Sequence, residues 1–211
     1  MSNANPIIVN IRKALNRLPN DTVSYRPAIL NSRIPGSQVT ELDMLIAEIN
    51  KLSGLARRIT LDQIENELLN LIKVEKITKT VLWDSPWLNQ FKLKNLLESN
   101  NIEIIPNNFP KDKLALCELG ITEVDFALPE TGTLVLFSSL SKPRTTSLLP
   151  RVHLALLNPQ VLVPDLHQVF ESARYRPYMV FITGPSRTSD IELITTLGVH
   201  GPKSLYVWAV C

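Results

Sequence analysis

Short unbroken apolar runs, alternating with helical patterns, constrain the fold of this chain more than any other feature. The runs YMVFI (178–182) and LYVWAV (205–210) carry apolar residues at consecutive positions, which is typical of strands covered on both faces. Between such runs, apolar residues recur at three-and-four spacing, as they do in helices. The alternation predicts an α/β protein with a mostly parallel sheet of about seven strands between helical layers.

The first 37 residues differ in pattern from the rest. Residues 5–18 place Ile7, Ile11 and Leu18 on one helical face. Residues 19–37 contain three prolines and many small polar residues, so they read as an extended arm. Such an arm either wraps over its domain or serves as a lid or an oligomer contact. We therefore expect a helix and an arm in 1–37 and a single α/β domain in 38–211.

Helix signals are dense in the first half of that domain. Apolar spacing predicts a helix over 39–56, and Thr60 with Gln63 forms a capping-box pattern that opens a second helix. Ser85 followed by Pro86 is typical of a helix start, with a cap residue and a first-turn proline.

The second half begins with a predicted helix over 111–119, closed by Gly120. The runs 124–128 and 133–137 are β-type, and the tight P-E-T-G segment between them predicts antiparallel neighbours.

Composition argues against several functional classes. Lys and Arg number 22 and Asp and Glu number 20, a net charge of +2 without a basic run, so we expect no nucleic-acid binding. The longest apolar run, Leu205 to Cys211, is far shorter than the ~20 residues of a membrane span, so we expect no membrane insertion. The cysteines Cys117 and Cys211 are far apart and the three histidines are scattered, so no metal site and no cofactor are evident. The cytoplasm is the expected compartment.

The loop after the run 178–182 is the first candidate site. Gly184 and Pro185 form a turn, and Ser186, Arg187 and Thr188 add hydroxyl donors and one guanidinium. A strand feeding a glycine turn and a helix start leaves backbone N–H groups free for an anion, and arginine holds a carboxylate through two parallel hydrogen bonds. In open α/β sheets ligands gather beyond the carboxyl ends of strands. The alternative is an ordinary strand–helix turn.

The helix in that argument is expected from a second capping box. Ser189 with Glu192 would open a short helix that ends at Gly198. Asp190 then fits a first-turn helix acid better than a catalytic group, and His200 fits a turn residue.

Two further residues are candidates for chemistry. Glu130, at the tight strand–strand turn, can serve as a base, a nucleophile or a hydrogen-bond acceptor. Alternatively Gly132 makes the turn and Glu130 is solvated. His153, inside the apolar run VHLAL, is either a hydrogen-bonded core histidine or a ligand donor or acid/base group.

Charge is also unevenly distributed. Six basic residues against two acidic ones give residues 138–189 an excess of +4: Lys142, Arg144, Arg151, Arg174, Arg176 and Arg187 against Asp165 and Glu171. A positive rim of this kind suits an anionic small molecule, unless these are solvated loop charges.

Three motifs carry a family resemblance. ALPETGTLVLF (127–137), RVHLALLNPQVLVPDL (151–166) and ITGPSRTSDIE (182–192), followed by LGVHGP (197–202), closely resemble the LUD-domain family over about residues 112–210. The resemblance implies a three-layer α/β/α fold related to ribose-5-phosphate isomerase and the CoA transferases. It also implies a cytoplasmic part in oxidising L-lactate to pyruvate, alongside iron–sulfur partner proteins.

The resemblance also selects positions in the motifs. The positions carried over are Glu130, Thr131, Gly132, Gly184, Pro185, Ser186, Arg187, Thr188 and Asp190. With His153, we expect them to bind a small anionic metabolite, with Glu130 as the candidate catalytic residue. Two alternatives remain: a stand-alone enzyme acting on a CoA-linked or phosphorylated small molecule, and a non-catalytic assembly protein that docks iron–sulfur subunits.

Overall fold

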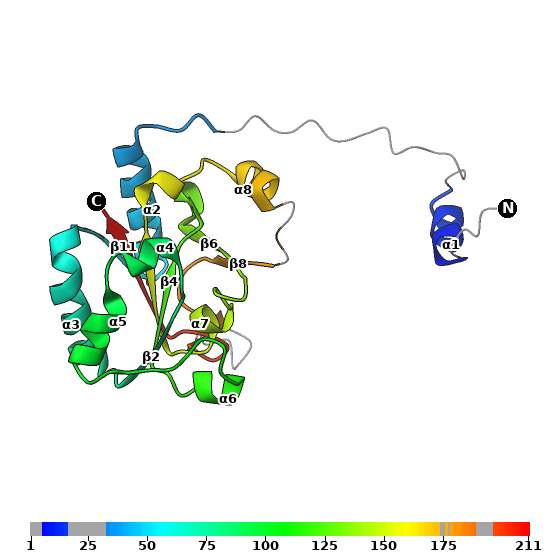
Figure 1. Cartoon of the computed structure of the whole chain (residues 1–211). Helices are drawn as coiled ribbons and strands as arrows, with labels where there is room; N and C mark the ends of the chain where they lie inside the picture. The colour runs from blue at the N-terminus through cyan, green and yellow to red at the C-terminus, as the bar shows by residue number, and fades with distance from the viewer. Residues whose placement is uncertain (1–5, 17–32, 174–175, 177, 189–195) are drawn as a thin grey trace. The chain divides into compact units, whose positions relative to one another are not determined.

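The computed structural model describes residues 6–16, 33–173, 176, 178–188 and 196–211 (Figure 1). The chain divides into two compact units, Met1–Ser32 and Arg33–Cys211. The described part of the first unit is helix α1 (Pro6–Ala14) and the turn that ends it, and its residues Ile7, Ile8 and Ile11 are exposed. Most of the predicted arm, 19–32, lies outside the described residues.

A six-stranded sheet forms the centre of the second unit, in the order β1-β11-β7-β4-β2-β3. Its strands are β1 (Leu55–Ile59), β2 (Lys79–Leu82), β3 (Glu103–Ile104), β4 (Leu119–Glu123), β7 (Val152–Leu157) and β11 (Ser204–Val210). All neighbouring pairs in it are parallel. The predicted α/β class with a mostly parallel sheet is confirmed.

Helices and a second sheet cover the two faces of this sheet. The helices are α2 (Gln38–Lys51), α3 (Ile64–Glu75), α4 (Pro86–Asn89), α5 (Leu93–Ser99), α6 (Lys111–Leu114), α7 (Thr145–Leu148) and α8 (Leu166–Ala173), with 3₁₀ turns η1 (Leu61–Gln63), η2 (Pro129–Thr131) and η3 (Pro159–Val161). Figure 1 shows α3 and α5 on one side of the six-stranded sheet and α7, β6 and β8 on the other. The Tyr206 hydroxyl of β11 reaches α3 and donates to Glu75 Oε1 at 2.8 Å.

The second sheet is antiparallel, in the order β5-β6-β8. Its strands are β5 (Phe126–Leu128), β6 (Thr133–Phe137) and β8 (Met179–Ile182). The predicted hairpin around η2 is therefore confirmed, but the run 178–182 was wrongly placed in the parallel sheet. As an edge strand β8 is covered less than expected, and its Phe181 is 41% exposed.

The predicted helix over 39–56 is too long at its C-terminal end: α2 ends at Lys51, and β1 begins at Leu55. The backbone leaves the helical region at Ser53, where φ is +67°. The Asn50 side chain then ties the helix to β1: its Oδ1 accepts from the Ala56 N–H at 2.7 Å and its Nδ2 donates to the Ala56 carbonyl at 3.1 Å. A Cβ on Gly54 would lie 2.5 Å from Ile49 Cγ2, so the turn needs glycine.

The predicted helix over 111–119 is also too long: α6 ends at Leu114, and Gly120 lies inside β4. A Cβ on Gly120 would lie 1.9 Å from the Thr146 carbonyl oxygen of α7. The glycine therefore marks a close approach of two backbones rather than a helix end.

Two predicted helix starts are confirmed. Ser85 Oγ accepts from the Leu88 N–H at 3.2 Å, and Thr60 with Gln63 forms the capping box. The prediction of a helix that ends at Gly198 is wrong for its last residues. Thr196 and Leu197 form strand β10, which pairs antiparallel with β9 (Arg187–Thr188). The expected start of that helix, 189–195, lies outside the described residues.

Candidate functional site

A row of four residues crosses the six-stranded sheet, and two of them, His153 and Leu205, line the candidate site. Strand register aligns Val81 with Gly120, Gly120 with His153, and His153 with Leu205. This row faces α7, because the Gly120 backbone lies against Thr146. Gly120, the neighbour of His153 on β4, has no side chain and leaves the His153 ring room on this face.

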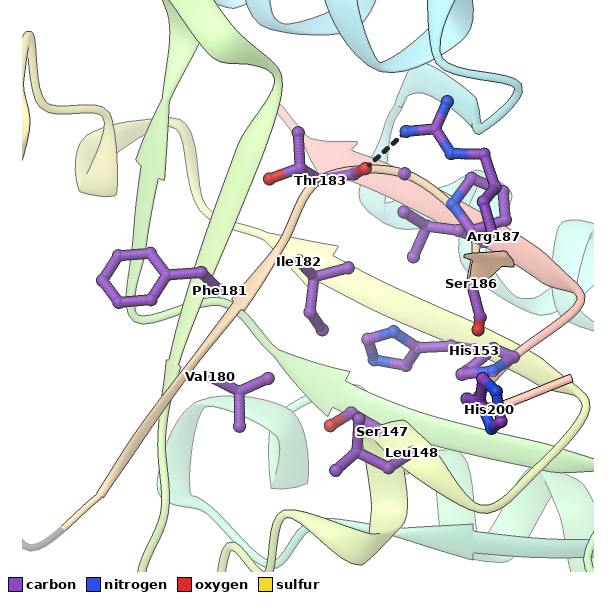
Figure 2. Close-up of a pocket in the computed structure, with 15 residues that line it drawn as sticks. Ser147, Leu148, His153, Val180, Phe181, Ile182, Thr183, Ser186, Arg187 and His200 are labelled. Carbon is purple, nitrogen blue, oxygen red and sulfur yellow. Dashed lines mark hydrogen bonds between the residues drawn. The ribbon is translucent and has the colours of Figure 1, made fainter. Parts of the chain in front are cut away.

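The walls come from segments far apart in the sequence, and they enclose a cavity of about 330 Å³. Helix α7, strand β8, the loop after β8 and the loop before β11 contribute them (Figure 2). We call it the His153 cavity, lined by Ser147, Leu148, His153, Val180, Phe181, Ile182, Thr183, Gly184, Pro185, Ser186, Arg187, His200, Gly201, Pro202 and Leu205.

The loop after β8 is held tightly. Gly184 has φ +86°, and a Cβ there would lie 2.9 Å from the Leu52 carbonyl oxygen at the end of α2. The Ser186 N–H donates to the Pro202 carbonyl at 2.9 Å, and its carbonyl accepts from the Gly198 N–H at 2.9 Å. The Ser186 amide is therefore engaged, unlike the free amides expected at a helix start. The loop instead leads into the β9–β10 hairpin.

Arg187 supplies the positive charge of the His153 cavity. Its Nη2 donates to the Thr183 carbonyl at 3.1 Å, and among the described residues no carboxylate forms an ion pair with it. A guanidinium has five N–H donors, so further donors remain for a carboxylate.

Other basic residues of the predicted positive rim are engaged inside the fold. Lys142 pairs with Glu123 and Asp125, and Arg151 pairs with Glu75. Arg144 stacks on the Tyr178 ring, 4.6 Å from its centroid. Of the described basic residues in this segment, Arg187 alone lines the cavity.

His153 is 1% exposed and makes one hydrogen bond, from Nε2 to Thr122 Oγ1 at 2.9 Å. Its Nδ1 has no hydrogen-bond partner in the part of the chain that the structure describes. Burial lowers the pKa of His153 to about 3, so the ring is neutral at pH 7. In Figure 2 the ring extends toward Ile182 and Ser147.

Glu130 opens onto a different cavity. That cavity of about 620 Å³, the Glu130 cavity, is lined by Leu128, Glu130, Thr131, Thr133, Pro164, Asp165, Leu166, His167, Phe181 and Thr183. The Glu130 side chain is 66% exposed, and its Oε2 lies 3.9 Å from Arg33 Nε. Arg33 also forms a two-pronged ion pair with the buried Glu41, with Nη1 to Oε1 at 2.8 Å. The hydrogen bonds from Arg33 lower the pKa of Glu41 against the opposing effect of its burial.

Strand β8 and Thr183, the residue that follows it, separate the two cavities. Phe181 and Thr183 line both. Thr183 Oγ1 lies 2.8 Å from Thr133 Oγ1, which lies 2.8 Å from Thr131 Oγ1. This chain of three hydroxyls connects the turn of Glu130 with the strand end that precedes Arg187.

The match to a known family extends across both cavities. Residues 60–210 match the LUD domain. The chain belongs to the LUD-domain family. The match begins well before residue 112, where the resemblance in the sequence motifs starts, and it includes every strand of the central sheet except β1.

Several curated relatives of this LUD domain are named lactate utilization protein C. The protein named lactate utilization protein C from Halalkalibacterium halodurans is 30% identical over 178 residues, 79% of this chain and 77% of that protein. Its namesake from Shouchella clausii is 32% identical over 156 residues, 69% of this chain and 68% of that protein.

A solved structure shares the fold of this LUD domain. A DUF162 family protein from Deinococcus radiodurans has a TM-score of 0.61 and 17% identity, over 84% of this chain and all of that one. At this identity the likeness shows the fold alone.

The structure distributes the predicted site residues of the LUD domain over two places. His153, Gly184, Pro185, Ser186 and Arg187 line the His153 cavity, whereas Glu130 and Thr131 line the Glu130 cavity. Gly132 is not in the lining of either: its φ is +62° and a Cβ there would lie 2.9 Å from the Ile49 nitrogen of α2. Thr188 lies in β9, and Asp190 is outside the described residues.

Sequence reasoning missed several cavity residues. His200, Gly201 and Pro202 belong to the LGVHGP motif, which is the signal that points to them. Ser147 in α7 also lines the cavity, and Thr122 in β4 hydrogen-bonds His153 from outside the lining. Neither has a local signal, because helix packing and sheet register position them.

The cavity also lies at the other end of the sheet from the one expected. His153 is the second residue of β7, and Pro202 precedes β11, so the cavity meets the amino ends of these parallel strands. The reason is that β8 belongs to the antiparallel sheet, and Ser186 in the loop after it donates to the Pro202 carbonyl.

The described residues hold no group of three or more His, Cys, Asp or Glu side chains that could bind a metal ion. They also form no helix long and apolar enough to span a bilayer.

Proposed function

We propose that this LUD domain takes part in lactate utilization by binding a small organic-acid anion in the His153 cavity. The observation that carries the proposal is a cavity with a guanidinium on its lining and a buried imidazole on its floor. The names of the relatives that cover most of this chain support the choice of lactate and pyruvate as ligands. Arg187 pairs with the carboxylate, because none of the described carboxylates engages it.

The proposal also has a cellular setting. The family resemblance supports a cytoplasmic protein that works alongside iron–sulfur proteins in the oxidation of lactate to pyruvate. A tagged chain purified from its native cells should carry proteins with iron–sulfur clusters, identified by mass spectrometry and by their visible absorption. A chain purified without them under gentle lysis argues against this part of the proposal.

Calorimetric titration with L-lactate and pyruvate tests the anion site. Arg187→Ala removes a charge-assisted pair and should cost about 2 kcal/mol of binding, roughly 30-fold in Kd. Arg58→Ala, on the edge strand β1 and paired with Asp43, is the matched control and should bind as the parent does. Equal titrations for the parent and Arg187→Ala would remove Arg187 from the site.

A second candidate function rests on the Glu130 cavity, whose size and exposed carboxylate suit a larger substrate. In this reading Glu130 attacks an acyl-CoA thioester: an anhydride bond forms at its carboxylate, the thioester bond breaks, and the CoA thiolate leaves. Intact-protein mass spectrometry after incubation with acetyl-CoA should then show an added acetyl group that Glu130→Gln abolishes. No added mass with a panel of acyl-CoA thioesters excludes this function.

A further inference from the structure

The buried imidazole of His153 has one satisfied nitrogen and one unsatisfied nitrogen. Nε2 has Thr122 Oγ1 at 2.9 Å, and Nδ1 has no partner among the described residues although the side chain is 1% exposed. Native proteins rarely leave a buried polar atom of this kind unpaired, because its lost hydration is not replaced. The fold thus maintains a hydrogen-bonding atom without a partner at the floor of a cavity.

The neighbouring groups do not supply the missing partner. The Ser147 hydroxyl, also on the cavity wall, donates to the Arg144 carbonyl at 3.0 Å. The row neighbours Val81, Gly120 and Leu205 have no polar side-chain atom. Ile182, from β8, presents an apolar side chain on the same side (Figure 2).

The charge state of the ring limits what it can bind. Burial keeps the imidazole neutral at pH 7, so it offers a hydrogen bond but no charge. The positive charge of the cavity is on Arg187, in the loop after β8. A ligand that satisfies both groups therefore has an anionic end and an uncharged oxygen.

The bond to Thr122 allows two proton arrangements. When Nε2–H donates to Thr122 Oγ1, Nδ1 is an acceptor and suits a hydroxyl group of the ligand. When the Thr122 hydroxyl donates to Nε2, Nδ1 carries the proton and suits a carbonyl oxygen. The same pair can therefore bind an alcohol or the ketone formed by its oxidation.

We propose that His153 Nδ1 is the specificity-determining contact of this cavity: it hydrogen-bonds the hydroxyl or oxo oxygen of a short hydroxy acid or oxo acid, and Thr122 sets the position of the ring proton. This inference rests on the proposed function, because it takes the carboxylate site at Arg187 as given. It adds the class of ligand and the direction in which the ligand lies, with its carboxylate toward the loop and its hydroxyl toward the sheet.

A comparison of L-lactate with propionate isolates the contact, because propionate lacks only the hydroxyl group. We expect the parent protein to bind L-lactate roughly five- to tenfold more tightly than propionate in calorimetric titrations. His153→Gln, whose amide matches the position of Nε2, should bind both acids equally. His153→Asn is the matched variant: its amide branches at Cγ, as Nδ1 does, and it should keep the preference for lactate.

A measurement on the parent protein covers the case in which these variants fail to fold. With ¹⁵N-labelled histidine, L-lactate should shift the Nδ1 resonance of His153 and propionate should leave it unchanged. His167→Gln and His200→Gln identify the other two histidines in the spectrum.

The outcomes separate this inference from the proposed function. Equal affinity for both acids, with both weakened by Arg187→Ala, overturns the role of His153 and leaves the anion site standing. A preference for lactate that survives in His153→Gln, or an Nδ1 resonance that ignores lactate, also overturns it. No binding of either acid at millimolar concentration overturns both proposals.

Discussion

The His153 cavity and the Glu130 cavity share a wall yet hold their polar groups in opposite ways. In the first, a neutral imidazole is fully buried and one of its nitrogens has no partner among the residues that the structure describes. In the second, a carboxylate is mostly in solvent and lies near Arg33. A buried group without a partner costs the folded state free energy, whereas an exposed carboxylate costs it nothing. A buried polar group with a missing partner therefore indicates a ligand more strongly than an exposed charge in a larger cavity does.

The largest expected effect comes from the residue that brings α7 over the His153 cavity. Gly120→Ala places a Cβ 1.9 Å from the Thr146 carbonyl oxygen, and backbone cannot move aside cheaply. We expect a loss of about 4 kcal/mol or more in the free energy of unfolding, measured by urea titration.

Gly36→Ala is the control for this substitution. Its added Cβ would meet its nearest atom, Glu41 Oε1, at 3.4 Å, so stability should change by about 0.5 kcal/mol or less. If Gly120→Ala is as stable as Gly36→Ala, α7 does not lie against β4 as described.

Glu41→Gln should have the next largest effect, beside the Glu130 cavity. The substitution breaks a two-pronged pair with a buried carboxylate and leaves Arg33 with the longer contact to Glu130, so we expect a loss of about 3 kcal/mol in urea unfolding. A loss below about 1 kcal/mol would mean that the pair is solvated.

The pH dependence of stability tests the burial of His153. The folded protein does not protonate this ring until about pH 3, whereas the unfolded chain protonates it below about pH 6.5. The unfolded state therefore binds more protons between these values, and stability falls as the pH drops below 6.5. The slope from this group should approach about 1.4 kcal/mol per pH unit.

Urea titrations at pH 7, 6 and 5 measure that slope, in a range above the titration of most carboxylates. His153→Asn has no ring to protonate and should show a flatter line. If the free energy of unfolding has the same slope against pH in the parent and the variant, the imidazole reaches water in the folded protein.

The smallest effect is expected at Glu130. Glu130→Gln removes a charge that is 66% exposed and 3.9 Å from Arg33, so the free energy of unfolding should change by about 0.5 kcal/mol or less. Lactate binding should change less than about twofold, because the side chain lines the other cavity. A large drop in lactate affinity would mean that one ligand spans both cavities, so the two cavities would then form a single site.

Local chemistry made part of this structure predictable. The caps at Thr60 and Ser85, the hairpin at Gly132 and the strand β11 follow from residues close together in the chain. The loop from Gly184 to Arg187 was also found from its own residues, and it does line a cavity.

The remainder depends on partners distant in sequence. Strand β1 has the sequence LARRI, with two arginines, and becomes a strand because β11 pairs with it. Gly120 was interpreted as a helix end because only the position of α7 reveals its role. The contact between Thr122 and His153 follows from the register of β4 against β7, which local patterns do not specify.

Asn50 has a consequence that reaches beyond the end of α2. β1 is the outer strand of the six-stranded sheet, and its Ala56 directs both backbone groups away from β11, where the Asn50 carboxamide binds them. The Asn50 carboxamide makes the two hydrogen bonds with Ala56 that a neighbouring strand would make, and it occupies the position such a strand would need. At the opposite border, β3 spans two residues and offers little to pair with. Edge-to-edge pairing of this sheet with that of another molecule is thus blocked at β1 by the Asn50 amide and at β3 by the short length of the strand.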